Sequence, residues 1–173
     1  VMSLRKILIH PDRRLTKKCA QITSFDSSLR HLADDMFETM YDAPGIGLAA
    51  PQIGVLFQIF VMDCASKEEK PNPLVFINPV INWASTENFT HNEGCLSIPE
   101  QYEDITRPAN IKVSFQNLEG KKFELSLQGI EATCVQHEID HLNGKLFIDY
   151  LSSLKRRMIT DKMKKLKREK ARN

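Results

Sequence analysis

The segment 136–141 contains the pattern His-Glu-x-x-His, with histidines at positions 137 and 141. In an α-helix with about 3.6 residues per turn, residues four apart lie on the same face. If the segment is helical, His137 and His141 can therefore bind one metal ion. Glu138 lies next to the first ligand, where it can act as a general base on a water bound to that ion. The pattern indicates a hydrolytic metal site, and a helix that carries two histidines by chance is the alternative.

A hydrolytic metal site usually has three protein ligands and one open position, so the chain must supply a third ligand. In one large group of metalloproteases a third histidine follows the pattern, but Phe147 occupies that position here. A downstream glutamate is the other common solution. The only glutamate after His141 is Glu169, inside a basic tail. These observations place the third ligand upstream of His137.

Two cysteines can supply a thiolate ligand. Cys134 lies on the same helical face but is seven residues from His141, or about 10.5 Å along the axis at roughly 1.5 Å per residue. One ion with bonds of about 2.0–2.3 Å cannot easily reach both ends of that span. Cys95 lies in the segment EGCLS, where Gly94 lets the backbone approach a site closely. We therefore predict Cys95 as the third ligand and Cys134 as part of a pocket wall.

Three segments together resemble the signature motifs of the peptide deformylase family, in the family's order and at its spacing. They are residues 45–52 (GIGLAAPQ), 93–97 (EGCLS) and 137–141 (HEIDH). The resemblance runs through nearly the whole chain, from Ile7 to the basic C-terminal segment. It implies a metal-dependent hydrolase that removes the N-formyl group from the initiator methionine of nascent polypeptides and releases formate.

The resemblance also implies one divalent metal ion per chain, held by the three ligands named above. Ferrous iron is the family's usual ion, and nickel, cobalt or zinc can replace it, whereas the general affinity order favours zinc over iron. Glu138 would be the catalytic base. The side-chain amide of Gln52 and the backbone N–H of Leu96 would stabilise the oxyanion, as acyl-transfer chemistry requires.

By similarity, the substrate methionine side chain enters an apolar pocket. His91 stands where many relatives carry an apolar residue. Tyr102 stands where some bacterial members carry arginine. We also expect Arg107 to pair with Asp140 and to steady the metal-binding helix. The small residues of 45–52 also fit a tight helix-to-strand crossing, and the resemblance favours a substrate-binding edge. The predicted substrate-binding residues are Gly45, Ile46, Gly47, Ile130, Thr133 and Cys134.

The patterns of apolar residues predict an α+β fold, with small, mainly antiparallel sheets packed around a central metal-binding helix and a further helix at the C-terminus. Ser24 or Asp26 can cap the first helix, and residues 117–120 fit a hairpin turn. Helices are expected over 26–42, 129–143 and the tail. Strands are expected over 57–62, 74–77, 79–84, 86–91, 111–116 and 122–127.

A length of 173 residues suits one domain, so we expect a single deformylase-like catalytic domain over 1–173, with 152–173 as a basic C-terminal helical extension. No apolar run approaches the ~20 residues of a membrane span, and no signal-peptide pattern is found. Four cysteines without a dense framework fit reduced thiols. We expect a cytoplasmic monomer without membrane contact. Met2 resembles a natural start, which would make Val1 an added residue.

The C-terminal segment segregates positive charge. Residues 155–172 hold ten Lys or Arg against two acids, a net +8, whereas the whole chain carries +2 and the remainder therefore about −6. Such segregation steers binding to a polyanion. The alternative is a solvated helix that packs on its own domain. Similarity to ribosome-associated deformylases favours a contact with ribosomal RNA, which would bring the enzyme close to its substrates, the N-formylmethionyl nascent chains. A partial apolar stripe accompanies the charge: Leu151, Leu154, Met158, Ile159, Met163 and Leu166.

Two other functions are compatible with parts of the sequence. A small metallopeptidase would use the same ligands and Glu138, but Phe147 disfavours it. A non-enzymatic, zinc-stabilised RNA-binding module would keep the basic tail but would have no use for Glu138 or Gln52. Such a module would also normally close the fourth coordination position of its metal.

Overall fold

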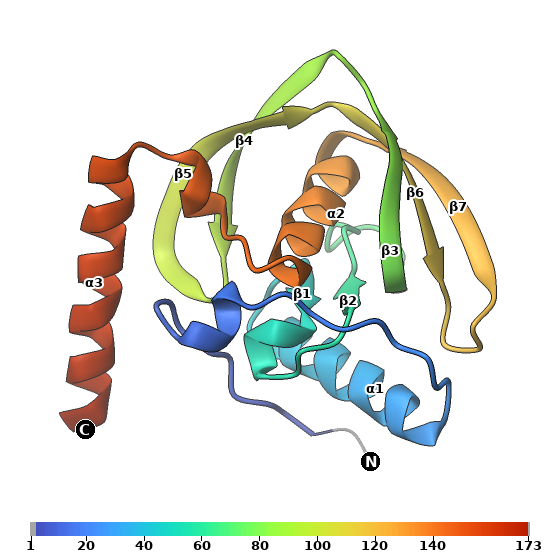
Figure 1. Cartoon of the computed structure of the whole chain (residues 1–173), viewed down its shortest axis with the longest axis horizontal. Coiled ribbons are helices and arrows are strands. Elements are labelled where there is room, and N and C mark those ends of the chain that lie inside the picture. The colour runs from blue at the N-terminus through green and yellow to red at the C-terminus, as the bar shows by residue number, and fades with distance from the viewer. Residues whose placement is uncertain (1–2, 173) are drawn as a thin grey trace.

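A computed structural model of the chain describes residues 3–172 (Figure 1). Val1 and Met2, on which the expectation about the start of the chain rests, lie outside the described residues, as does Asn173. The three predicted helices are present. They are α1 (Ser27–Asp42), α2 (Gly129–Leu142) and α3 (Ser153–Arg172), and the short 3-10 helices are η1 (Arg13–Thr16), η2 (Ala50–Ile53) and η3 (Phe147–Tyr150).

The strands form two antiparallel sheets, which confirms the α+β prediction. The larger sheet has the order β1 (Gly47–Ala49), β2 (Ile59–Met62), β3 (Leu74–Ala84), β6 (Asn110–Gln116) and β7 (Lys122–Gln128). The smaller sheet is a hairpin of β4 (Asn88–Cys95) and β5 (Ile98–Pro108). Helix α2 lies in the middle of the molecule and contacts strands of both sheets (Figure 1). The predicted metal-binding helix is therefore central.

Three of the predicted strands needed correction. The runs at 74–77 and 79–84 belong to one strand, β3, which is irregular at Asn78, where φ is 51° and the pairing with β6 shifts register. The side chain of Asn78 holds this kink through two hydrogen bonds with the backbone of Ile22. The run at 86–91 continues to Cys95 as β4, and β5 was not predicted. Most side chains of β5 are polar or charged because one face of the hairpin is exposed, which hides the strand pattern.

The core forms on both faces of the short strand β2. Phe60 and Met62 pack with residues of α2, whereas Ile59 and Val61 pack with residues of α1. This alternation is the period of two expected for a buried strand. Asp26 caps α1, since its carboxylate accepts a hydrogen bond from the backbone N–H of Leu29 at 3.1 Å. Helix α1 and strand β2 together fix the position of β1, the edge strand next to α2.

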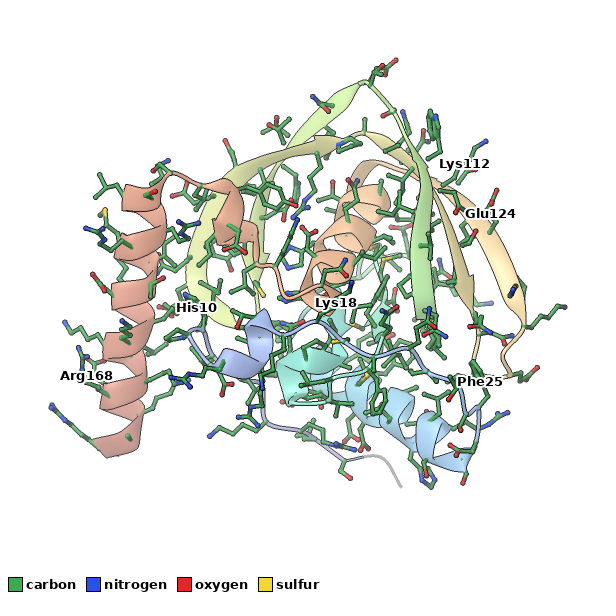
Figure 2. All side chains as sticks on the ribbon, in the orientation of Figure 1. His10, Lys18, Phe25, Lys112, Glu124 and Arg168 are labelled. Atoms are coloured by element: carbon green, nitrogen blue, oxygen red, sulfur yellow. The ribbon has the colours of Figure 1, made fainter. Side chains whose placement is uncertain are left out.

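Helix α3 packs against the rest of the chain by a narrow face. Only Ile159 and Met163 are buried, in a cluster with residues of η1, β5 and η3. Leu154 and Met158 of the predicted stripe are more than half exposed. All ten basic residues of α3 are exposed. Figure 2 shows Arg168 on the outer side of α3 and His10 facing the helix, where its Nε2 lies 2.8 Å from the hydroxyl of Thr160.

Among residues 3–172, no helix is both long enough and apolar enough to cross a membrane.

Candidate active site

The three predicted metal ligands come together where strand β4 ends beside helix α2. The sulfur of Cys95 and one ring nitrogen each of His137 and His141 lie within 4.8 Å of one another. The Cys95 sulfur is 3.3 Å from Nε2 of His141. Both histidines are buried. Ligands with bonds of about 2.0–2.3 Å to one ion converge over such distances, so these residues fit a single divalent metal.

The β4–β5 hairpin sets the position of Cys95. Cys95 pairs with Ile98 across the tight end of the hairpin, next to a register shift after Glu93. A Cβ at Gly94 would collide with the ring of Tyr102, which covers the backbone there. Glycine therefore allows the Tyr102 ring to lie against the backbone at this point.

A buried ion-pair network joins this hairpin to α2. Arg107 of β5 donates two hydrogen bonds to Glu93, at 2.6 and 2.9 Å, and a third to Asp140 of α2 at 2.8 Å. Glu93 also accepts a hydrogen bond from Nδ1 of His137 at 2.9 Å. The predicted Arg107–Asp140 pair is therefore confirmed. Sequence reasoning missed Glu93, although it stands only two residues before Cys95, in the EGCLS segment.

This network orients the histidine ligands. An ionised carboxylate can only accept a hydrogen bond, so the Nδ1 of His137 must donate to Glu93, and a metal ion would bind Nε2 in place of a proton. Burial acts to lower the pKa of His137, but its contacts with Cys95 and Glu93 outweigh burial and raise the pKa well above its usual value. Burial lowers the pKa of His141 well below its usual value. His141 is therefore neutral at pH 7, which is the form that ligates metals.

Glu138 lies at the same end of α2 as the ligands and is buried. Its Oε1 has no hydrogen-bond partner among the described residues. Burial raises the pKa of Glu138 to about 7. A carboxyl group with a pKa near neutrality and an unoccupied oxygen can accept and return a proton at working pH. Among the side chains around the three ligands, this is the group best suited to act as an acid–base catalyst.

Gln52 is held with its amide directed at Cys95. Its Oε1 accepts a hydrogen bond from the N–H of Ala49 at 2.9 Å, which fixes the orientation of the amide. Its Nε2 donates to the hydroxyl of Ser97 at 3.1 Å and approaches the Cys95 sulfur at 3.5 Å. The side chain is 2% exposed, so the donor lies in a site shielded from bulk water. This placement agrees with the predicted orientation of Gln52 towards the reaction centre.

A cavity of about 420 Å³ opens beside these groups. A Cβ at Gly47 would lie 2.7 Å from a Glu138 oxygen and 2.9 Å from the Cys134 sulfur, so glycine keeps this part of the cavity open. The cavity wall includes every predicted substrate-binding residue, together with Leu96, His91 and Tyr102. The sequence did not identify four further lining residues: Pro44, Asn92, Pro99 and Glu100.

Comparison with known proteins identifies the family. A sequence model of the family described as polypeptide deformylase matches residues 4–157. The chain belongs to this family. Its members remove the N-formyl group from nascent peptides, so the family assignment excludes the metallopeptidase and the RNA-binding module considered above.

Individual relatives cover nearly the whole chain. The peptide deformylase of Bradyrhizobium diazoefficiens is 52% identical over 168 residues, which cover 95% of this chain and 97% of the relative. The crystal structure of a peptide deformylase from Legionella pneumophila matches with a TM-score of 0.90 at 46% identity, over 99% of both chains. The peptide deformylase of Ehrlichia chaffeensis in complex with actinonin matches with a TM-score of 0.92 at 42% identity, over 96% of this chain and 99% of the other.

Proposed function

We propose that this deformylase hydrolyses the formamide bond of N-formylmethionyl peptides with Cys95, His137 and His141 holding one divalent metal ion and Glu138 transferring the proton. One observation carries the assignment of roles. A buried carboxyl group with an unpartnered oxygen and a pKa of about 7 lies beside three convergent donor atoms, at the wall of a cavity. Such a group is placed to activate water for attack on a carbonyl carbon.

Each protein group has a defined task in this proposal. A divalent ion bound at the site supplies Lewis-acid chemistry, which acidifies water and polarises a carbonyl oxygen. Glu138 accepts a proton from the attacking water and later returns it to the nitrogen that leaves when the C–N bond breaks. The Gln52 amide and the backbone N–H of Leu96 donate hydrogen bonds to the formyl oxygen, which carries negative charge after water attacks and before the C–N bond breaks. Formate and a free amino terminus are the products.

We infer that the resident ion is ferrous iron, and that zinc, nickel or cobalt can occupy the same ligands. One thiolate and two imidazoles form a ligand set of intermediate softness, which suits all four of these ions. The choice of iron rests on the resemblance to the family. Metal analysis of protein purified anaerobically from its own host would test it, and a zinc content near one per chain without iron would contradict it.

We further propose that the methionine side chain of the substrate occupies the cavity beside Gly47. Ile46, Ile130 and Cys134 offer apolar and sulfur surface there, which suits a thioether side chain. The absence of a side chain at Gly47 allows the substrate backbone to approach Glu138 closely.

The decisive experiment is formate release from formyl-Met-Ala by anaerobically purified protein of known metal content. Acetyl-Met-Ala, which has a methyl group in place of the formyl hydrogen, is the matched control for the size of the acyl group that water attacks. Glu138→Gln preserves the shape of the side chain and removes the base. The proposal is supported if the wild type releases formate and hydrolyses little of the acetyl peptide. Fully metal-loaded Glu138→Gln should release little formate. Near-normal release by that variant would overturn the role of Glu138.

We also propose that α3 contacts ribosomal RNA, which would place the enzyme beside its substrate in the cytoplasm. The exposure of all ten basic residues supports this contact, because Ile159 and Met163 can hold the helix to the domain while the charged face stays free. Lys165→Glu with Arg168→Glu should weaken sedimentation with ribosomes and reduce its salt dependence. The matched control is Lys67→Glu with Lys70→Glu, which makes the same charge change in an exposed loop. Equal loss in both variants would mean that net charge alone is responsible.

We expect the chain to work as a monomer and as one catalytic domain over 1–173, with 152–173 as its extension. Sedimentation equilibrium would test the first expectation, and a single cooperative unfolding transition followed by two probes would test the second.

A further inference from the structure

One aromatic side chain covers the ion pair that ties the β4–β5 hairpin to α2. The side chains of Arg107 and Glu93 are 5% and 3% exposed, whereas that of Asp140 is 17% exposed. The hydroxyl of Tyr150 donates a hydrogen bond to Oδ2 of Asp140 at 2.8 Å, and Arg107 donates to the same oxygen at 2.8 Å. The guanidinium carbon of Arg107 lies 5.0 Å from the centroid of the Tyr150 ring. Tyr150 therefore contacts both partners of the pair.

Both contacts of Tyr150 strengthen the pair. Burial and the hydrogen bond with Asp140 raise the pKa of Tyr150 above its usual value, so its hydroxyl keeps its proton at pH 7 and acts as the donor. A hydrogen bond to a carboxylate is stronger than one between neutral groups, and a guanidinium is attracted to the face of an aromatic ring. Tyr150 is 51% exposed and Arg107 is buried, so the ring shields the guanidinium from solvent on the side that it contacts.

The short helix η3 holds Tyr150 in this place. Phe147 of η3 is 1% exposed, and its ring is stacked on that of His137 with the centroids 6.1 Å apart. Cys95 packs against the core cluster that contains Phe147. One end of η3 therefore contacts two of the predicted metal ligands, and the other end carries Tyr150. A ring that projects from a buried element loses little conformational freedom when it makes its contacts.

The alternative role for Tyr150 is to support helix α3, which begins at Ser153. The hydrogen bond and the cation–π contact of its side chain are both made with the ion pair and not with α3. Helix α3 is held to the domain elsewhere, by the buried side chains of Ile159 and Met163. These contacts favour a role at the ion pair.

We propose that Tyr150 is a positioning residue for the deformylase reaction. It keeps the Arg107–Asp140 pair closed, which holds the β4–β5 hairpin on α2 and keeps the sulfur of Cys95 3.3 Å from Nε2 of His141. This role rests on the proposed function, because it requires that Cys95 and the two histidines hold the ion. The effect on metal affinity can be measured whether or not the protein releases formate.

The weaker arm of the network is the one that Tyr150 covers. Arg107 donates two hydrogen bonds to Glu93 but only one to Asp140. Without the hydroxyl and the ring, water can compete for Asp140, and an ion pair in contact with water contributes little. The hairpin is then held less firmly on α2. Because both histidine ligands lie on α2, a shift of the hairpin moves Cys95 relative to them and leaves their own spacing unchanged.

The test compares two variants of Tyr150 with one matched control. Tyr150→Phe removes only the hydroxyl, and Tyr150→Leu also removes the ring. The control is Tyr41→Phe, because Tyr41 of α1 is 49% exposed and its hydroxyl likewise donates to a carboxylate, that of Asp63, at 2.6 Å. Cobalt(II) is the probe, since its absorption reports coordination geometry and the bond to the thiolate. Competition with a chelator gives the cobalt affinity, and urea unfolding gives the stability of the metal-free protein.

We expect Tyr150→Leu to bind cobalt about 10-fold more weakly than the wild type, at the lower end of the range of roughly 10–100-fold for groups that support metal ligands. Tyr150→Phe should show an intermediate loss. The absorption of the sulfur–cobalt bond should change in Tyr150→Leu, whereas Tyr41→Phe should match the wild type in affinity and absorption. At full metal loading, Tyr150→Leu should lower kcat and leave KM near the wild-type value, because Tyr150 is not among the described residues that line the cavity.

A double-mutant cycle tests the route through Asp140. Asp140→Ala should weaken cobalt binding by itself. Adding Tyr150→Phe to that variant should weaken binding little further, because the acceptor of the hydroxyl is already absent. If Tyr150→Leu does not fold, as judged by circular dichroism, Tyr150→Phe and this cycle decide the question.

Three results would overturn the proposal. They are cobalt affinities of the Tyr150 variants that equal that of Tyr41→Phe, a loss of stability in urea without any change in affinity or absorption, and effects of Tyr150→Phe and Asp140→Ala that simply add. If the wild type binds cobalt but releases no formate from formyl-Met-Ala, the proposed function has failed instead, and the cobalt affinities still decide the role of Tyr150.

Discussion

Glu93→Gln separates the structural and metal-binding roles of one buried carboxylate. Glu93 is 3% exposed and accepts hydrogen bonds from two nitrogens of Arg107 and from Nδ1 of His137. Removing one partner of a buried ion pair costs roughly 3–5 kcal/mol, because the other charge is left without compensation. Asp140 also pairs with Arg107, at 2.8 Å, so we expect the free energy of unfolding to fall by about 3 kcal/mol, at the lower end of that range.

The same substitution should weaken metal binding. Glutamine can present its amide to His137 in either orientation, so it no longer enforces the tautomer in which Nε2 faces the metal. Loss of such a supporting hydrogen bond typically costs about 10–100-fold in metal affinity. Urea unfolding of the metal-free protein measures the first effect, and competition with a chelator of known affinity measures the second.

Glu103→Gln is the matched control. Glu103 pairs in register with Glu93 across the β4–β5 hairpin, but its side chain is 31% exposed and contacts Lys155 at 3.4 Å. An exposed pair of this kind contributes at most about 1 kcal/mol, so the control should leave stability and metal affinity nearly unchanged. If Glu93→Gln behaved like this control in both measurements, the Arg107 network would not hold the site together.

The pH dependence of the metal-free protein adds a second test. Burial acts to raise the pKa of Glu93, but the hydrogen bonds from His137 and Arg107 outweigh burial, and the pKa lies below its ordinary value of 4.5. A carboxyl group with a lowered pKa stabilises the fold above its unfolded pKa, and this contribution is lost as the pH falls through the folded pKa. The stability difference between wild type and Glu93→Gln should therefore be full at pH 7 and shrink below about pH 4.5. A difference that grows on acidification would contradict the assignment.

Three further predictions concern the site. Glu138→Gln should keep the metal and lower kcat by at least roughly 10²-fold, as loss of a general base usually does; steady-state kinetics at measured metal content would check this. Cys95→Ser should lose the metal, whereas Cys134→Ser should retain about one ion per chain, by metal analysis; equal loss would refute the ligand assignment. Gly47→Ala should fold normally by circular dichroism but lose activity, because its Cβ would lie 2.7 Å from a Glu138 oxygen. Wild-type kinetics in that variant would show that the contact can relax.

The sequence was informative wherever local geometry decides the outcome. The four-residue spacing of His137 and His141 is enough to place two ligands on one helical face. The span along that helix was enough to reject Cys134 and to favour Cys95. The capping role of Asp26 also depends only on the neighbouring residues. Each of these features follows from the geometry of a single element.

Features that depend on packing between elements could not be predicted. Strand β5 looks polar because one face of its hairpin is exposed, although Ile105 and Arg107 point inward. Six apolar residues of the tail marked a stripe, five of them within α3, but the packing of the helix buries only Ile159 and Met163. The role of Glu93 requires knowledge that Arg107 and His137 meet it from two other elements.

The ion-pair network links the site to the fold. Cys95 comes from β4, and the two histidines come from α2, so the ligand set exists only when the hairpin and the helix hold a fixed relative position. Arg107 donates both to Glu93 on β4 and to Asp140 on α2, and Glu93 in turn binds His137. These bonds fix that position before a metal binds, which lowers the ordering cost of binding. By linkage, a metal that binds only the folded chain must in turn stabilise the packing of the β4–β5 hairpin on α2. Because a weakened network also lowers metal affinity, a higher metal concentration should then be needed to raise the free energy of unfolding by the same amount as in the wild type.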